Sequence, residues 1–160
     1  MKTLVVYYSN AGNTDAAAQI IAKELSADLL RLIPEKEIAK EGFQRFFLGG
    51  MKSTFGWGTK LKKYDLKMTE YDQIILGTPV WASSPCPAVN RFLKEIHDTS
   101  KITSVFTFST SGDNEKCIKK LERRIPGLIR HVSLYDRKFP EHAGDNDSKL
   151  KGFIEKCRIA

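Results

Sequence analysis

A short segment near the N-terminus combines residue types that bind phosphate. It reads Ser-Asn-Ala-Gly-Asn-Thr over residues 9–14, so no bulky side chain keeps a ligand away from its backbone N–H groups. An apolar, β-prone run precedes it at residues 4–7, and an amphipathic helical pattern begins at Thr14. A helix N-terminus offers free N–H groups and a partial positive charge, and the hydroxyls of Ser9 and Thr14 add donors. The segment therefore predicts an anion site, although an ordinary strand-to-helix turn would also use Asn and Gly.

Two other kinds of phosphate loop are excluded by residue spacing. The dinucleotide fingerprint needs three spaced glycines after a strand, and this segment has only Gly12. A P-loop needs a glycine directly before Lys-Ser/Thr, whereas Met51 precedes Lys52 and Ser53. A Gly-Trp-Gly sequence at residues 56–58 follows no strand and lacks the last glycine of a dinucleotide loop.

Two further segments could hold a planar ring. Trp81 follows Pro79 in what we expect to be a loop just beyond a buried strand, where its face could stack on a ring or simply shield the strand end. Residues 109–115 are mostly small, which lets backbone N–H groups approach the polar edge of a heterocycle. In this second loop, Asp113 or Asn114 could instead cap the following helix.

Strands and helices must alternate for these segments to meet. Apolar runs predict strands at residues 3–8, 28–33, 73–77, 103–109 and 129–135, with helical patterns between them. Such alternation predicts a parallel sheet with right-handed crossovers, in which ligands bind at the carboxyl ends of the strands. Residues 41–68 are the least regular, and we expect there a covering helix and a long loop. This stretch carries a basic patch formed by Lys52, Lys60, Lys62, Lys63 and Lys67.

Several of these blocks resemble the flavodoxin family. The first strand with its Ser-x-x-Gly-x-Thr loop, residues 74–81, Pro87 with residues 91–93, and residues 108–112 look like the corresponding blocks of short flavodoxin-like proteins. The resemblance covers nearly the whole chain and implies one domain over residues 1–160. It implies an α/β fold, a flavodoxin-like three-layer α/β/α sandwich with a five-stranded parallel sheet in the order 2-1-3-4-5.

The same resemblance implies FMN as the cofactor and assigns three groups of binding residues. The phosphate group would be held by Ser9, Asn10, Ala11, Gly12, Asn13 and Thr14. The isoalloxazine ring would be flanked by Thr78, Pro79, Val80, Trp81, Ala82 and Ser83. Its polar edge would be bonded by Thr110, Ser111, Gly112 and Asp113.

The chain departs from the usual flavodoxin pattern in the loops that would surround the ring. Flavodoxins usually carry an aromatic residue in the loop after the fourth strand, and residues 109–115 contain none, so the outer ring face is expected to be open. Flavodoxins also favour a glycine in the turn beside the ring, which eases a peptide flip on reduction. Ala82 and Ser83 provide none, and positive φ costs a non-glycine residue about 1 kcal/mol or more. We therefore expect this flip to be disfavoured.

Composition sets the remaining expectations. The 160 residues are 41% hydrophobic and 28% charged, which is typical of a globular domain, and no apolar run approaches a membrane span. The net charge of +7 favours acidic protein partners, anionic substrates or an anionic membrane surface, while no nucleic-acid recognition motif is visible. Three cysteines in separate contexts suggest free thiols and the cytoplasm. No metal-ligand spacing and no acid–base catalyst is recognised.

Three functions remain open from the sequence. The first is an FMN-binding electron carrier with a redox partner protein. The second is an NAD(P)H-dependent FMN or quinone reductase on the same fold, which an open ring face would favour by leaving room for a small quinone-like acceptor. The third is a flavin-free binding module.

Overall fold

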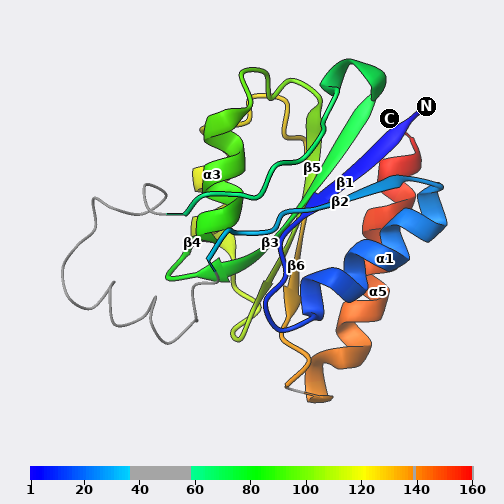
Figure 1. Cartoon of the computed structure of the whole chain (residues 1–160). Coiled ribbons are helices and arrows are strands. Elements are labelled where there is room, and N and C mark those ends of the chain that lie inside the picture. Colours follow the sequence, from blue (N-terminus) through cyan, green and yellow to red (C-terminus); the bar gives the residue numbers. More distant parts are fainter. Residues whose placement is uncertain (37–58, 139, 160) are drawn as a thin grey trace.

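The computed structural model describes residues 1–36, 59–138 and 140–159, and shows a sheet between two helical layers (Figure 1). Lys52 and most of residues 41–68, where a covering helix and a long loop were predicted, lie outside the described residues. Along the chain, the elements are β1 (Thr3–Tyr7), α1 (Asn13–Leu25), β2 (Asp28–Arg31), η2 (Met68–Glu70), β3 (Gln73–Trp81), β4 (Ser84–Pro85), α3 (Pro87–Glu95), β5 (Ile102–Ser109), α4 (Glu115–Glu122), β6 (Arg130–Tyr135), η3 (Pro140–His142) and α5 (Ala143–Arg158).

The sheet confirms the predicted topology. Its order is β2-β1-β3-β5-β6, with all four of these neighbouring pairs parallel, and the short β4 pairs antiparallel with the end of β3. Without β4, this is the predicted order 2-1-3-4-5. β1 is buried along its whole length, as its continuous apolar sequence requires for a central strand covered on both faces.

The two faces of the sheet carry separate cores. Helices α3 and α4 cover one face, where Phe92 and Leu121 are fully buried, and α1 and α5 cover the other, where Ile21 and Phe153 pack against the sheet (Figure 1). This arrangement is the predicted α/β/α sandwich. Among the described residues, none of the helices combines the length and the apolar character needed to cross a bilayer.

Local sequence explains most element boundaries. Pro87 occupies the first turn of α3, where its missing N–H costs nothing. Gly12 precedes α1 with φ of 88°, a conformation that favours glycine. The helix α5 begins at Ala143, and Asp145 places a carboxylate in its first turn, where the partial positive charge of the helix favours it.

The largest difference from the sequence prediction is at the end of β3. This strand was expected to end at Gly77, but it continues to Trp81 and turns back through Ala82 and Ser83 into β4. The segment interpreted as a proline-fixed loop is therefore a β-hairpin. Pro79 is compatible with the extended strand, since strand ends at the sheet margin tolerate the loss of one N–H donor.

Candidate functional site

A cavity lies at the carboxyl ends of β1, β3 and β5, which is where parallel sheets place their ligands. Its enclosed volume is only about 50 Å³, enough for a group of phosphate size, so a larger ligand would project from it. Its lining residues are Ser9, Asn10, Ala11, Asn13, Thr14, Pro79, Val80, Trp81, Phe108, Ser109, Thr110 and Asp136.

The loop after β1 has the properties of an anion site. The hydroxyl Oγ of Ser9 is buried and has no hydrogen-bond partner in the described part of the chain. Gly12 is the N-cap of α1, and its carbonyl accepts the first intrahelical bond, from the N–H of Ala16 at 3.0 Å. The preceding N–H groups of the first turn are therefore outside the helical ladder. A buried donor without a partner, beside a helix N-terminus, fits a phosphate.

A carboxylate that the sequence reasoning missed also lines this cavity. Asp136 follows β6 directly, and its Oδ1 accepts bonds from Asn13 Nδ2 at 2.8 Å and from the N–H of Lys138 at 3.1 Å. Its own N–H donates to the carbonyl of Ser109 at 2.8 Å. The residue thus ties the phosphate loop to two other strand ends. The sequence did offer a signal for this residue, since it directly follows the last predicted strand. Ligands bind at the carboxyl ends of parallel strands, and this rule had identified the other loops.

Tyr7, Asp15 and Arg31 form a small network of hydrogen bonds and an ion pair next to the phosphate loop. Arg31 Nη2 donates to the carbonyl of Ser9 at 3.3 Å, and its Nη1 lies 3.8 Å from the carboxylate of Asp15. The Tyr7 hydroxyl donates to Asp15 at 2.6 Å, and burial followed by this bond raises the pKa of Tyr7 to about 12. Arg31 therefore brings a positive charge next to the loop while Tyr7 remains neutral at physiological pH.

The β3–β4 hairpin forms the opposite wall of the cavity, with a strained turn at its tip. Ala82 and Ser83 have φ of 49° and 57°, the left-handed pair that a two-residue hairpin turn requires and that Asn-Gly usually supplies. Both residues thus adopt the positive φ that is costly for a non-glycine residue, and the disfavoured peptide flip stays a prediction. Each non-glycine residue in this region costs roughly 1–2 kcal/mol, so the surrounding contacts must hold the turn.

Three of the six residues predicted to flank the ring do not line the cavity. Ala82 and Ser83 are exposed at the hairpin tip. Thr78 is fully buried, and its Oγ1 donates to the carbonyl of Pro79 at 2.9 Å and accepts from the N–H of Cys86 at 3.2 Å. Its side chain therefore holds the base of the hairpin and is not available to a ligand.

Trp81 is mostly a core residue. Its side chain is only 5% exposed and packs edge-on against Tyr8, with ring centroids 6.3 Å apart and an interplanar angle of 85°. It also lines the cavity with Pro79 and Val80. The indole thus presents a small part of its surface to a ligand, and both the ring-contact and the shielding interpretations of this residue retain support.

The loop after β5 divides into two parts. Thr110 lines the cavity, together with Phe108 and Ser109, neither of which was among the binding residues assigned from the resemblance. Gly112 and Asp113, by contrast, line a separate open pocket of about 350 Å³ beside β6. The predicted Ser111 and Gly12 do not line the cavity either.

The turn in this loop is fixed by bonds within the protein. Ser109 Oγ accepts from the N–H of Gly112 at 2.9 Å, and Asp113 Oδ1 accepts from the N–H of Glu115 at 3.3 Å. Gly112 has φ of 67°, and a Cβ there would lie 2.3 Å from the ring of Tyr135. Asn114 is the N-cap residue of α4 and makes no side-chain cap bond, and Asp113 accepts the N–H of the first helical residue.

Cys86 is buried beneath the hairpin. Its side chain is completely inaccessible, and burial raises the pKa of its thiol to about 11, opposed by a bond with Thr78. All three cysteines are free and buried. In the described ranges, no group of three or more His, Cys, Asp and Glu side chains is placed to hold a metal ion.

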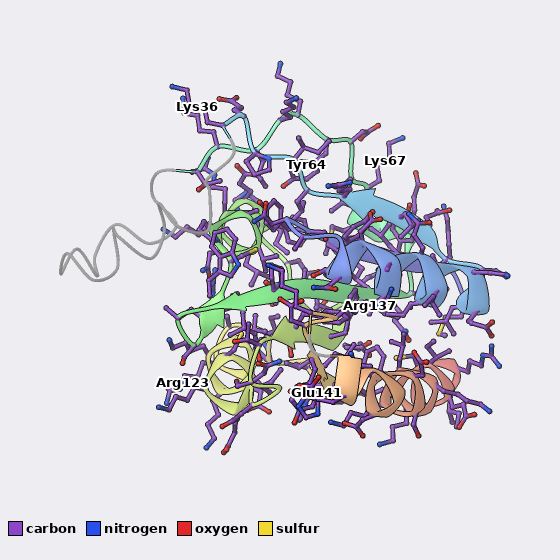
Figure 2. The ribbon with its side chains drawn as sticks, turned by 90° about the horizontal axis from the view of Figure 1, so that it is seen from below. Lys36, Tyr64, Lys67, Arg123, Arg137 and Glu141 are labelled. Carbon is purple, nitrogen blue, oxygen red and sulfur yellow. The ribbon has the colours of Figure 1, made fainter. Side chains whose placement is uncertain are left out.

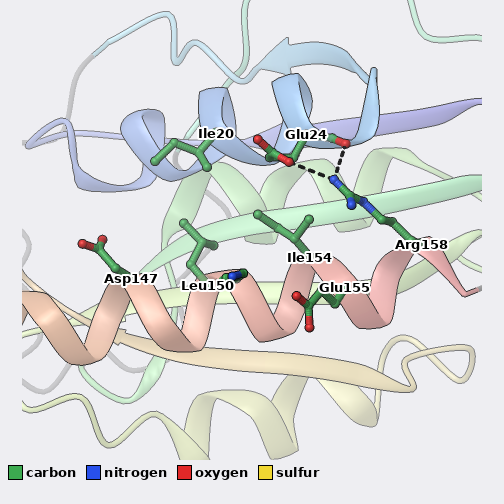
Figure 3. Close-up of a pocket in the computed structure, with 8 residues that line it drawn as sticks. Ile20, Glu24, Asp147, Leu150, Ile154, Glu155 and Arg158 are labelled. Carbon is green, nitrogen blue, oxygen red and sulfur yellow. Dashed lines mark hydrogen bonds and ion pairs between the residues drawn. The ribbon is translucent and has the colours of Figure 1, made fainter.

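A larger groove lies elsewhere, between α1 and α5 (Figure 3). Its volume is about 320 Å³, its floor is formed by Ile20, Leu150 and Ile154, and an ion pair of 2.8 Å between Glu24 and Arg158 closes one end. It lies away from the strand ends and from the unpartnered hydroxyl of Ser9. The smaller cavity, at the carboxyl ends of the strands, is therefore the better candidate site.

Comparison with protein families identifies this architecture. A family model described as flavodoxin matches residues 51–156, which is more than half of the chain. The chain belongs to the flavodoxin family. A comparison with curated protein sequences finds no match.

Solved structures share the flavodoxin fold. A candidate flavoprotein from Bacteroides uniformis superposes with a TM-score of 0.69 at 24% identity, covering 84% of this chain and 90% of the other. A flavoprotein from Lactobacillus acidophilus, solved in complex with FMN, gives 0.64 at 21% identity over 95% and 97% of the two chains. The Trp repressor binding protein from Bacillus subtilis gives 0.64 at 13% identity over 96% and 97%.

Proposed function

We propose that this flavodoxin-family protein binds FMN in the cavity at the ends of β1, β3 and β5. The observation that carries the proposal is the buried, unpartnered Ser9 hydroxyl beside the N-terminus of α1, because a phosphate group would satisfy it. Membership of the flavodoxin family and the FMN complex of the Lactobacillus acidophilus relative support the same cofactor. When bound, FMN would supply the redox chemistry.

The residues present fit the parts of this cofactor. Ser9, Thr14 and the first-turn N–H groups of α1 would hold the phosphate. Val80 and Trp81 would contact the ring from the hairpin side. The second carboxylate oxygen of Asp136, for which no hydrogen bond is found among the described residues, would accept a bond from a hydroxyl of the ribityl chain.

Our leading function is an electron carrier that accepts electrons from a reductase and passes them to a partner protein. The cations on the described surface include Lys60, Lys62, Lys63, Lys67 and Lys36, all exposed, and Lys36 and Lys67 are visible in Figure 2. With a net charge of +7, such a surface favours an acidic partner. A cytoplasmic location stays a prediction, in keeping with three free thiols.

The second candidate is an NAD(P)H-dependent FMN or quinone reductase. The observation favouring it is that Thr110, the residue of the β5–α4 loop that lines the cavity with Ser109, is small. A small-residue loop leaves space over the outer ring face for a quinone-like acceptor. No catalytic acid or base is assigned, since the flavin would carry the reaction.

Flavin titration tests the cofactor proposal directly. The purified apoprotein should bind FMN, quench its fluorescence, and bind riboflavin at least about tenfold more weakly because the phosphate contacts are lost. FAD should not bind, because no dinucleotide fingerprint accompanies the phosphate loop. Equal affinities for FMN and riboflavin would contradict the phosphate assignment, and no binding of either would favour the flavin-free module. Anaerobic NADPH oxidation with a quinone acceptor then separates the carrier from the reductase.

A further inference from the structure

The strained turn of the β3–β4 hairpin is tied to a helix outside the hairpin. Lys120, on α4, donates from its Nζ to the Oγ of Ser84 at 2.6 Å. The same Ser84 hydroxyl lies 3.5 Å from the carbonyl of Ala82, to which it donates. One lysine therefore bonds the residue that follows the two positive-φ positions and orients the hydroxyl that reaches back to the turn.

A second cation, two residues beyond the end of α4, supports the same short strand. Arg124 donates to the side-chain oxygen of Asn90 and, at 3.3 Å, to its carbonyl. Asn90 Nδ2 in turn donates to the carbonyl of Pro85 at 2.7 Å. Both residues of β4 are thus connected to the region of α4, Ser84 directly and Pro85 through Asn90.

These contacts matter because the turn sequence does not favour its own conformation. An Asn-Gly pair forms this turn readily, whereas Ala82 and Ser83 must both be held at positive φ. Within the hairpin, only two residue pairs are in register, Val80 with Pro85 and Trp81 with Ser84. Because Val80 and Trp81 also line the cavity, whatever fixes the turn also fixes that wall.

We propose that Lys120 is a positioning residue of the candidate cofactor site. It holds the Ala82–Ser83 turn in its left-handed conformation through Ser84, and so keeps the Val80–Trp81 wall in the geometry that receives the ring. This role rests on the proposed function for its effect on FMN. Its effect on the hairpin itself does not depend on any cofactor.

The first experiment observes the hairpin in the apoprotein. The chain contains two tryptophans, so a Trp57→Phe background leaves Trp81, the partner of Ser84 in the hairpin, as the only indole. In this background, Lys120→Met should change the Trp81 emission and the near-ultraviolet circular dichroism, and Lys120→Arg should largely restore them. Lys116→Met is the matched control, because it removes the same charge from another exposed position of α4 at which no bond to the hairpin is found. If Lys120→Met leaves both Trp81 signals as they are in Lys116→Met, the clamp is refuted.

The second experiment measures FMN affinity with and without turn strain. Lys120→Met should weaken binding roughly three- to tenfold, the range expected for losing one hydrogen bond that positions a wall. The double change Ala82→Asn and Ser83→Gly supplies a turn that forms by itself. In that background, Lys120→Met should weaken FMN binding by less than about twofold. An equal loss in both backgrounds would mean that Lys120 acts by its charge, and would overturn the positioning role.

The two experiments distinguish failure of the clamp from failure of the cofactor proposal. If the unmodified protein binds no FMN, all variants fail the affinity measurement alike, while the Trp81 signals still report on the clamp. If FMN binds and the Trp81 signals do not respond to Lys120→Met, only the clamp is wrong.

Discussion

The two ends of the candidate site are built on different principles. At the phosphate end, one continuous segment supplies Ser9, Gly12 and the start of α1, and the left-handed conformation falls on a glycine. At the hairpin end, it falls on Ala82 and Ser83, and bonds from Lys120 and Asn90 hold the surrounding strand. The first end is organised by local sequence, and the second depends on tertiary contacts. Changes at the first end should therefore affect ligand binding most, and changes at the second should affect stability and packing.

The largest expected effect is on FMN binding and comes from Thr14→Asp. Thr14 is 2% exposed and lines the cavity, so the new carboxylate would face the phosphate. A like charge at about 4 Å costs about 4 kcal/mol at an effective dielectric constant of 20, and FMN affinity should fall at least about 100-fold. Flavin fluorescence titration measures this.

Two controls isolate the charge effect of this variant. Riboflavin affinity should stay within about threefold, because riboflavin carries no phosphate. Thr14→Val keeps the side-chain shape without adding charge, and should cost about tenfold in FMN affinity. A parallel loss of riboflavin and FMN binding in Thr14→Asp would indicate damage to the fold, which thermal unfolding of the apoprotein would reveal.

The contrast between the two ends also explains what the sequence could predict. The strand order, the two helical layers and the loop at residues 9–14 follow from periodicity and from residue types that act on their immediate neighbours. The hairpin could not be inferred, because Ala-Ser does not signal a left-handed turn and Pro79 suggested a loop. Its turn is held by Lys120, which is 36 residues from Ser84 in sequence.

Side-chain roles within the site were less predictable than its location. Thr78 and Asp113 were expected to contact a ligand, but each is engaged with the protein's own backbone. Phe108 lines the cavity because of how neighbouring strands are aligned, which sequence spacing alone does not specify. A residue whose position depends on several strands can be predicted only when the register of the sheet is known.

The next effect in size concerns stability at the hairpin end. Trp81→Ala removes a large, 95%-buried side chain that packs against Tyr8, and should lower the free energy of unfolding of the apoprotein by about 3–5 kcal/mol. Urea denaturation without flavin measures the change. Trp81→Phe should cost clearly less, since it retains an aromatic ring in the core. If Trp81→Ala weakens FMN binding but leaves apoprotein stability intact, the indole is a ring platform and not a core residue.

Two glycine substitutions compare local backbone strain with tertiary packing, and their expected effects on stability are smaller. Gly112→Ala adds a Cβ that would lie 2.3 Å from the Tyr135 ring, at φ of 67°, and should destabilise the protein by about 2–4 kcal/mol. Gly12→Ala has open space around its Cβ and φ of 88°, so only backbone strain of about 1–2 kcal/mol applies. Thermal unfolding of both apoproteins gives the comparison. Equal destabilisation would show that Tyr135 moves away at little cost, and that packing adds nothing to the strain at Gly112.

The smallest effect is expected at Cys86, the buried thiol beneath the hairpin. Burial raises its folded-state pKa to about 11, above the ordinary value of 9.0. The stability linked to its protonation is therefore complete below about pH 9 and is lost as the pH rises through about 11. At pH 8, the thiol should react slowly with an aromatic disulfide reagent, because reaction requires the thiolate and an opening of the hairpin.

The rate of this thiol reaction can compare the two ends without any cofactor. Cys86→Ala identifies the signal of this thiol against those of the other two buried cysteines, and should change FMN affinity by less than about twofold. If the hairpin depends on tertiary contacts, removing the Lys120 contact should accelerate the modification of Cys86. Ser9→Ala, at the phosphate end, should not. Equal acceleration by Ser9→Ala would mean that the two ends open together, and that the site is one cooperative unit and not two separately supported walls. Rapid reaction of Cys86 in the protein without substitutions would show that the hairpin opens readily. This would contradict the proposal that the Val80–Trp81 wall is held in place.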